Sequence, residues 1–292
     1  MVNDKKCAAI VLNYNDFENA IKFVNMIRNF SVIDQIIVVD NASTDKSYEE
    51  LMRLSDSNIF VCKTDKNGGY GFGNNFGIRI AKERYNCEIA FVCNSDIIVT
   101  EECMEAIART ILESNNVVIA SAIQKNGFTG NVIKGTSWDV PKTLDYIRNS
   151  LVIFNAIVPV RTDNYKKSIE EVGCVPGAFL AVDINKFLSF GGYDEGIFLF
   201  CEESVIGARA KNSGFRTVIL TDYYYEHYHS ISINKSIPNE INKFKLTLRS
   251  RKYYLRKYRN LNKVQMLGIN MIFGFGILEW KAKLFLQKVV HK

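Results

Sequence analysis

The chain has 292 residues, of which 47% are hydrophobic and 23% charged, and this composition excludes a largely disordered protein. Its formal net charge of +6 is uneven, because residues 243–292 hold 13 Lys or Arg and one acid while the rest of the chain carries −6. Seven cysteines without a Cys-x-x-Cys pair favour a reducing compartment over a disulfide framework or a zinc site.

Short runs rich in Val, Ile and Phe alternate with helical patterns over the first 125 residues. Four runs, residues 7–12, 35–40, 59–63 and 88–94, are typical of strands buried on both faces. Apolar residues recur at helical spacing over residues 20–27 and 104–112. The alternation predicts an α/β fold with a mostly parallel central sheet flanked by helices.

Asp40 ends one of these apolar runs and Asp96 follows another, residues 88–94, by two positions. A glycine- and asparagine-rich segment, residues 66–77, lies between them. The carboxyl ends of parallel strands meet at one sheet edge, where such sheets bind nucleotides and metals. Asp40 precedes turn-forming residues, so it could accept hydrogen bonds from a ribose or a base, or simply cap a helix. The segment offers close backbone approach and side-chain amides, but its glycine spacing does not match a dinucleotide fingerprint.

Three further groups could carry chemistry. Asp96 could hold Mg²⁺ or Mn²⁺ on a diphosphate, or merely end a turn. His227 and His229 follow a tyrosine-rich run and could bind a metal or a phosphate, or pack among the tyrosines. Glu202 and Glu203 could supply a general base and an orienting group, or stabilise a helix start.

The second half of the chain is less regular. Residues 127–167 predict a loop-like insertion that contains Trp138 and is expected to shape a ligand pocket, and residues 172–182 and 215–220 favour strands. Residues 264–278 are uncharged but too short to span a bilayer, so they predict an interfacial or buried helix. The N-terminus has no secretory pattern, and we expect a cytoplasmic protein.

Together these motifs resemble the family 2 nucleotide-sugar glycosyltransferases, particularly the rhamnosyltransferase-like branch, over residues 8–232. The matching segments are residues 11–15, 38–45 and 67–78, then Asn94-Ser95-Asp96 at the place of the family's Asp-x-Asp metal motif. Residues 177–179 and 191–195 look like the acceptor-side segment, and residues 198–203 look like the catalytic segment. His227 and Ser232 match the family's His-x-x-x-x-Ser, with His229 as a substitute if the register shifts.

The resemblance implies a GT-A fold, Rossmann-like over residues 1–236, with a donor half (1–125), an acceptor and catalytic half (126–236) and a helical C-terminal region (237–292). It implies that Glu203, with Glu202, serves as the catalytic base of an inverting transfer. Asp96 and His227 would hold Mg²⁺ or Mn²⁺. The implied donor-binding residues are Asn13, Asp40, Asn67, Gly68, Asn75, Asn94, Asp96 and His227.

The chain also departs from the family pattern. Glu203 stands where the base aspartate usually stands, and Val205-Ile206 replaces an Asp-Leu pair. A catalytically inactive nucleotide-sugar-binding protein is therefore the alternative to a transferase.

The resemblance also implies the partners. The expected donor is a UDP-hexose or dTDP-rhamnose, and the expected acceptor is a hydroxyl of a glycan or a polyprenyl-linked glycan in bacterial surface polysaccharide synthesis. The basic C-terminal end predicts peripheral docking on the inner face of the plasma membrane or, alternatively, an ordinary solvated helix, and nucleic acid is not an expected partner.

Overall fold

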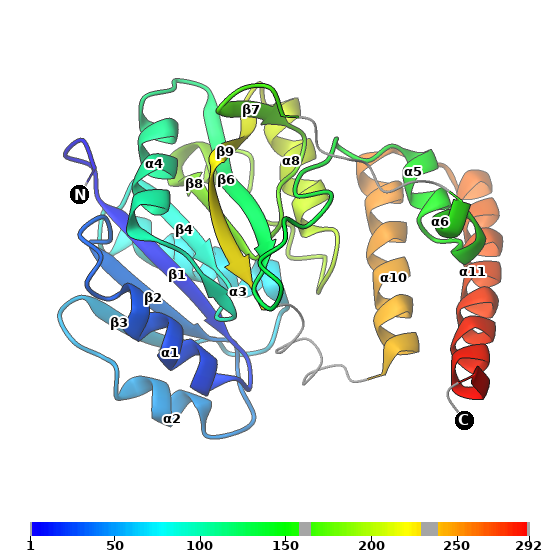
Figure 1. The fold of residues 1–292 in the computed structure, drawn as a ribbon, viewed down its shortest axis with the longest axis horizontal. Helices are drawn as coiled ribbons and strands as arrows, with labels where there is room; N and C mark the ends of the chain where they lie inside the picture. Colours follow the sequence, from blue (N-terminus) through cyan, green and yellow to red (C-terminus); the bar gives the residue numbers. More distant parts are fainter. Residues whose placement is uncertain (1, 158–164, 229–238, 291–292) are drawn as a thin grey trace.

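The computed structural model of the chain describes residues 2–157, 165–228 and 239–290, and it shows one nine-stranded sheet covered by helices (Figure 1). The strand order is β3-β2-β1-β4-β8-β6-β9-β5, and β7 pairs with β9. The strands are β1 Cys7–Asn13, β2 Gln35–Asp40, β3 Ile59–Lys63, β4 Ile89–Cys93, β5 Ile97–Ile98, β6 Val117–Asn126, β7 Ile169–Val172, β8 Phe179–Asp183 and β9 Arg216–His227.

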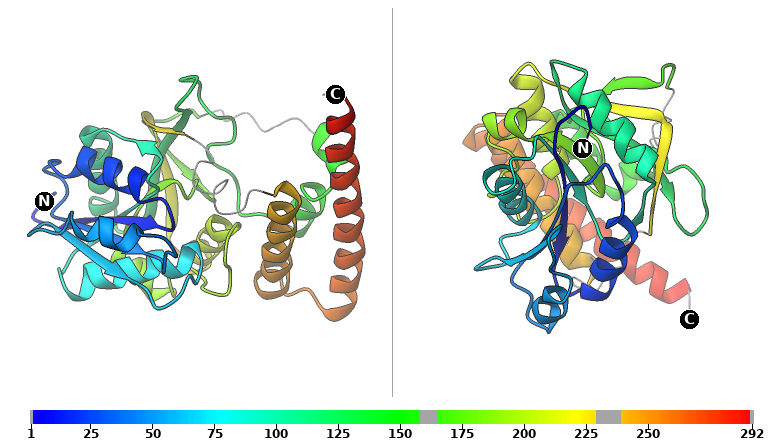
Figure 2. Two further views of the ribbon diagram at one scale, coloured as in Figure 1. Left: turned by 90° about the horizontal axis from the view of Figure 1, so that it is seen from below. Right: turned by 90° about the vertical axis from the view of Figure 1, so that its left-hand side faces the viewer.

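The helices fall into those that cover the sheet and those that lie beside it (Figure 2). The first group is α1 Phe17–Ile27, α2 Ser47–Met52, α3 Tyr70–Glu83, α4 Glu101–Leu112, α7 Ile184–Ser189 and α8 Glu202–Asn212. The second group is α5 Thr143–Arg148, α6 Val152–Ile157, α10 Glu240–Tyr258 and α11 Lys263–Val290.

The first half of the sheet confirms the predicted parallel arrangement. Strands β3, β2, β1 and β4 are parallel neighbours, with Asn13 opposite Asp40 and Val11 opposite Cys93. The carboxyl ends of β1, β2 and β4 therefore meet at one edge. The second half is mixed, because β8 runs antiparallel to both β4 and β6.

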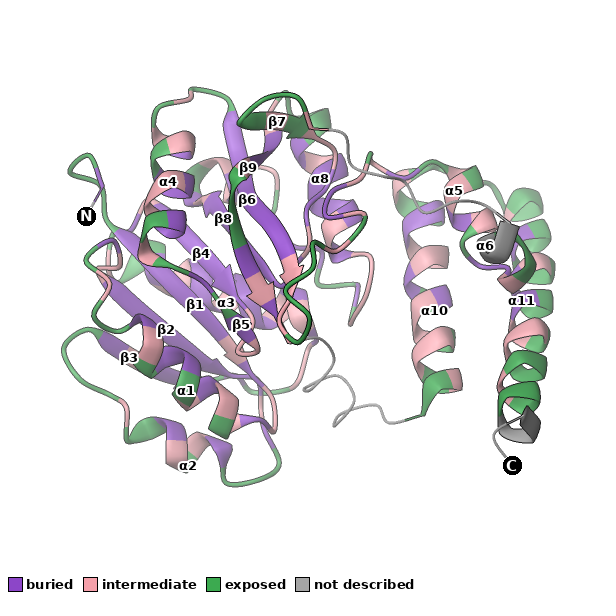
Figure 3. Ribbon diagram, in the orientation of Figure 1, coloured by how far each residue is buried: buried purple, intermediate pink, exposed green. Residues whose placement is uncertain are grey.

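Both faces of the sheet are buried, as the continuous apolar runs predict. In β1, Cys7, Ala9 and Val11 enter one core cluster, whereas Ala8 and Ile10 enter the cluster on the opposite face. This alternation follows from the two-residue period of a strand. Figure 3 shows the central strands as almost continuously buried.

Most of the glycine- and asparagine-rich segment, residues 66–77, is helical, because α3 begins at Tyr70. A Cβ on Gly73 would lie 2.3 Å from Leu12 Cδ1, and one on Gly77 would lie 2.5 Å from Ile10 Cγ2. The glycines are therefore needed where α3 packs closely on β1, and this packing outweighs their low helix propensity. Only residues 66–69 remain a loop.

The C-terminal helices share a core with the acceptor half. Val205 and Ile197 pack in one cluster with Tyr254 and Phe273. The insertion helices α5 and α6 contact α11, so this part of residues 127–167 supports the C-terminal helices. The predicted boundary at residues 236 and 237 lies outside the described residues and stays a prediction.

Candidate functional site

Asp40 lies at the carboxyl edge of the sheet and organises the loop that follows it. Its Oδ1 accepts a hydrogen bond from Asn13 Nδ2 at 3.0 Å, and its Oδ2 accepts one from the Ser43 backbone N–H at 3.1 Å. Lys63 Nζ lies 3.8 Å from Asp40 Oδ2. Asn13 Oδ1 is buried and has no hydrogen-bond partner among the described residues. Asn13 and Asp40, which are both predicted to bind the sugar nucleotide, are therefore in contact. The Asn13 side chain retains one unused hydrogen-bond acceptor.

A second contact, which the sequence did not reveal, links this loop to the glycine segment. Asn41 Nδ2 donates to Asn67 Oδ1 and to the Gly69 carbonyl, both at 3.1 Å. Asn67 Oδ1 also accepts from the Gly69 N–H. The position of Asn41 directly after Asp40 was the available signal.

The glycine segment also reaches the catalytic segment. Gly69 has a φ of 96°, and the Tyr70 N–H that follows it donates to the Phe198 carbonyl at 2.9 Å. Gly68 lies against the ring of Phe72. The loop of residues 66–69 thus joins the donor half to the segment that carries the glutamates.

Asn75 is held by the acceptor-side segment. Its Nδ2 donates to the Tyr193 carbonyl at 3.0 Å and to Glu195 Oε1 at 2.9 Å, and its Oδ1 accepts from the Tyr193 N–H. Both side-chain amide protons of Asn75 are used. This favours a role in positioning the acceptor-side segment over the predicted contact with the sugar nucleotide.

Asp96 and His227 meet because β5 pairs with the end of β9, with Ile97 opposite His227. Asp96 Oδ1 lies 3.2 Å from His227 Nε2. The other ring nitrogen, Nδ1, lies 2.7 Å from Gln124 Nε2. Gln124 carried no sequence signal, since its strand has no motif.

The pair suits a divalent ion. A carboxylate and an imidazole are ligands that Mn²⁺ accepts, and Mg²⁺ binds the carboxylate readily. The described residues include no cluster of three or more His, Cys, Asp or Glu side chains that could hold a metal. Two protein ligands leave coordination positions for diphosphate oxygens. His229 and Ser232 lie outside the described residues.

The two glutamates begin α8, directly after two residues with left-handed backbone angles, Phe200 (φ 69°) and Cys201 (φ 73°). Such conformations are costly for non-glycine residues and cluster at functional sites. Glu203 Oε1 accepts a hydrogen bond from the Gly177 N–H at 3.3 Å. The next residue, Ala178, accepts from the Asn94 N–H at 2.8 Å. Consecutive residues therefore hold Glu203 and the Asn94–Asp96 turn.

The glutamates differ in their surroundings. Burial raises the pKa of Glu203. Glu202 is only 4% exposed, and burial together with the charge of Glu203 raises its pKa well above the usual range. Glu202 Oε1 has no partner within the described ranges. Glu203 is only partly buried and is thus the more accessible carboxylate, and Glu202 favours the protonated form.

Acidic side chains thus gather at the carboxyl edge of a largely parallel sheet, which is the place where such sheets bind nucleotides and metals. Comparison with known proteins identifies the family: the profile described as Glycosyl transferase family 2 matches residues 8–180. The chain belongs to that family, and the family inferred from its motifs is confirmed.

Two curated relatives are a hexosyltransferase and a rhamnosyltransferase. The chain is 28% identical over 204 residues to the low-salt glycan biosynthesis hexosyltransferase Agl10 of Haloferax volcanii, covering 69% of this chain and 60% of that protein. It is 23% identical over 211 residues to the rhamnosyltransferase WbbL of Escherichia coli, covering 70% of this chain and 78% of that protein.

Solved structures confirm the GT-A fold class. GalNAc-T7, solved with UDP, GalNAc and Mn²⁺, superimposes with a TM-score of 0.61 at 13% identity, over 88% of this chain and 51% of that one. The mannosyltransferase PcManGT of Pyrobaculum calidifontis, solved with GDP-Man and Mn²⁺, gives 0.60 at 13% identity, over 97% and 75%. S. aureus TarS 1-349 with UDP-GlcNAc gives 0.54 at 16% identity, over 90% and 70%.

Proposed function

We propose that this glycosyltransferase is an inverting enzyme that moves a hexosyl or rhamnosyl group from a UDP- or dTDP-linked donor to an acceptor hydroxyl. The observation that carries the proposal is the shared support of the base and the metal turn by Gly177 and Ala178. Two consecutive backbone residues therefore position both the carboxylate that would take a proton and the turn that would hold the diphosphate.

Three groups of residues divide the work. Asn13, Asp40 and the loop of residues 66–69 bind the nucleoside. Glu203 takes the proton from the acceptor hydroxyl as this oxygen attacks the anomeric carbon from the face opposite the diphosphate. Attack from that face inverts the configuration.

Asp96 and His227 would hold Mg²⁺ or Mn²⁺ against the diphosphate. When bound, such an ion stabilises the negative charge that develops on the leaving group. The contact between the two side chains supports this assignment.

The acceptor and the cellular setting are also proposals. The two curated relatives are named for hexosyl and rhamnosyl transfer, which supports a glycan hydroxyl as acceptor. We infer a polyprenyl-linked glycan of a bacterial surface polysaccharide, used at the cytoplasmic face of the membrane.

The first test is calorimetric titration of the purified protein with UDP and with dTDP, each with and without Mn²⁺, on the native chain and on Asp96→Ala. We expect one nucleotide to bind in a metal-dependent way and the Asp96→Ala variant to lose that dependence. Binding of neither nucleotide would contradict the donor assignment.

A catalytically inactive nucleotide-sugar-binding protein is the second candidate, favoured by a glutamate at the position of the base aspartate. Val205 and Ile206, which replace an Asp-Leu pair, are both buried in core clusters, so their apolar character has a packing reason that does not require loss of activity. Donor hydrolysis measured by nucleotide release separates the two candidates, because a binding protein would release no UDP or dTDP from the sugar nucleotide.

A further inference from the structure

Helix α11 presents apolar side chains on two opposite faces. The inner face packs on the rest of the protein through Ile269, which is 4% exposed, and Phe273, which is fully buried. A Cβ on Gly276 would lie 2.2 Å from the Ser150 carbonyl oxygen. This face is therefore fixed against the neighbouring segments.

The outer face of α11 carries large apolar side chains that nothing in the described structure covers. They are Val264, Leu267, Met271, Phe275, Leu278, Phe285 and Leu286, each 54–79% exposed. At about 100° per residue they fall within an arc of roughly 100°, centred opposite the inner face. Figure 3 shows the exposed positions of this helix. A continuous apolar stripe of this size marks an interaction surface.

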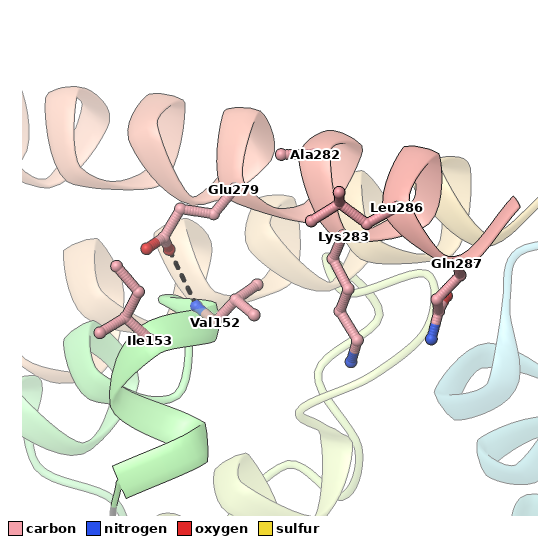
Figure 4. Close-up of a pocket in the computed structure, with 7 residues that line it drawn as sticks. All are labelled: Val152, Ile153, Glu279, Ala282, Lys283, Leu286 and Gln287. Atoms are coloured by element: carbon pink, nitrogen blue, oxygen red, sulfur yellow. Dashed lines mark hydrogen bonds between the residues drawn. The ribbon is translucent and has the colours of Figure 1, made fainter. Parts of the chain in front are cut away.

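A groove borders the stripe where α11 passes α6 (Figure 4). Its volume is about 590 Å³, and its lining residues are Val152, Ile153, Glu279, Ala282, Lys283, Leu286 and Gln287. Glu279 accepts a hydrogen bond from the Val152 N–H at 2.9 Å, which ties the two helices together. Ile153 and Phe154 are 55% and 48% exposed beside the groove. The apolar surface thus extends from α11 onto α6.

The charge around this surface is positive. Lys263 and Lys281 lie on one flank of the stripe and Lys283 on the other, roughly 100° from its centre. Glu279 is the sole acid in the sequence of α11, and it is engaged by Val152. Long lysine side chains can reach phosphate groups while neighbouring apolar side chains enter hydrocarbon.

We propose that the outer face of α11, together with Ile153 and Phe154 of α6, docks on a bilayer that contains anionic lipids. The helix lies in the plane of the interface, its apolar stripe enters the boundary between headgroups and acyl chains, and the groove receives an acyl chain. The inference stands without the proposed transfer reaction. If that reaction is correct, it holds the enzyme at the surface where a lipid-linked acceptor would be found.

Two other occupants fit less well. A second copy of the chain would bring the flanking lysines of two stripes together, and like charges beside such a seam are destabilising. A membrane-spanning arrangement would require the inner face to leave its core, and no described helix is long and apolar enough to cross a membrane.

The test is sedimentation of the full chain with vesicles of phosphatidylcholine alone or mixed with phosphatidylglycerol. We expect the native chain to bind the mixed vesicles and Met271→Glu/Leu278→Glu to bind roughly tenfold less. The matched control is Gln265→Glu/Asn270→Glu, which adds the same charge to exposed positions of α11 outside the stripe and should bind nearly as well as the native chain.

A second measurement does not depend on the stability of the glutamate variant. Phe275→Trp should show a blue-shifted emission with the mixed vesicles, and Asn270→Trp should not. Equal vesicle binding by the native chain and the stripe variant would overturn the proposal, as would no binding at all. A native dimer in sedimentation velocity without lipid, dissociated by Met271→Glu/Leu278→Glu, would assign the stripe to self-association instead.

Discussion

Lys257 of α10 donates a hydrogen bond of 2.8 Å to Asp194, which lies in the acceptor-side segment. Tyr253 and Tyr258 of the same helix also donate to this carboxylate. Burial alone would raise the pKa of Asp194, but the hydrogen bonds from Lys257 and Tyr258 outweigh it and lower the pKa to about 2. The Asp194 carboxylate therefore attaches α10 to the acceptor-side segment, which Asn75 of α3 also contacts.

Asp194→Asn should loosen this attachment. The pKa of Asp194 is lower in the folded chain than in the unfolded chain, so its negative charge stabilises the fold above about pH 4. This stabilisation is lost as the pH falls toward about 2. We expect the free energy of unfolding at pH 7 to drop by about 1–2 kcal/mol, and the difference from the native chain to shrink near pH 3. Urea denaturation at both pH values measures it. Asp222→Asn, the same change at an exposed position, should cost almost nothing.

Gly69→Ala should damage the junction between the donor loop and the catalytic segment. A Cβ there would lie 2.1 Å from the Phe198 carbonyl oxygen, which accepts the Tyr70 hydrogen bond. We expect a loss of about 2–3 kcal/mol in thermal unfolding, from strain and from the displaced bond. Gly130→Ala is the control, because Gly130 also has a positive φ but nothing lies within 4 Å of its added Cβ. Equal losses in both variants would show that backbone strain alone is responsible.

Glu203→Gln should abolish transfer while donor binding persists. Loss of a general base costs about 10²–10⁴-fold in rate. Since burial raises the pKa of Glu203, the native kcat/KM should fall as the pH drops through a value above that of an ordinary glutamate. Product formation across pH 5–9 checks both statements. A variant with native activity would remove Glu203 from the mechanism.

Glu202→Gln distinguishes the role of Glu202 from that of the neighbouring Glu203. The folded pKa of Glu202 is raised, so the protonated form stabilises the fold and this contribution is lost as the pH rises above the unfolded value. The amide has no charge to bury, so we expect a gain of about 1–3 kcal/mol at pH 8 and a smaller one at pH 5. Transfer should persist, in contrast to Glu203→Gln. A loss of stability at pH 8 would show that Glu202 is held as a carboxylate.

The fold could be predicted where burial dictates the sequence. Strands β1 to β4 are buried on both faces, so their apolar runs gave each boundary to within about one residue. The start of α3 could not be predicted in this way, because its glycines disfavour an isolated helix. Gly73 and Gly77 are explained only by the strands beneath them, and Gly71 only by its close contact with Tyr193.

Asp40, Asp96, His227 and Glu203 could be singled out from the sequence because each side chain could itself carry chemistry, and their roles stay predictions. The residues that hold them were missed, because their contacts depend on the folded chain. Gln124 and His227 are separated by 103 positions in the sequence, and Asp194 and Lys257 by 63. Neither pair lies in a local sequence pattern from which the contact could be predicted.

Gln124 sets the hydrogen bonding of His227, and its replacement should weaken metal binding. In this structure Gln124 Nε2 faces Nδ1 of His227. To coordinate an ion through His227 Nε2, the ring must carry its proton on Nδ1, so the Gln124 amide must turn to present its carbonyl oxygen to that nitrogen. Gln124→Leu removes this acceptor. We expect the affinity for Mn²⁺ in the presence of UDP to fall by about 10–100-fold, measured by calorimetry.

Gln124→Glu provides the comparison, because its carboxylate still accepts from Nδ1 and should retain most of the affinity. Thermal unfolding of the metal-free variants controls for folding. If Gln124→Leu folds normally and binds Mn²⁺ with native affinity, metal binding does not depend on the side chain of Gln124, and Gln124 has no role in orienting His227 toward the ion.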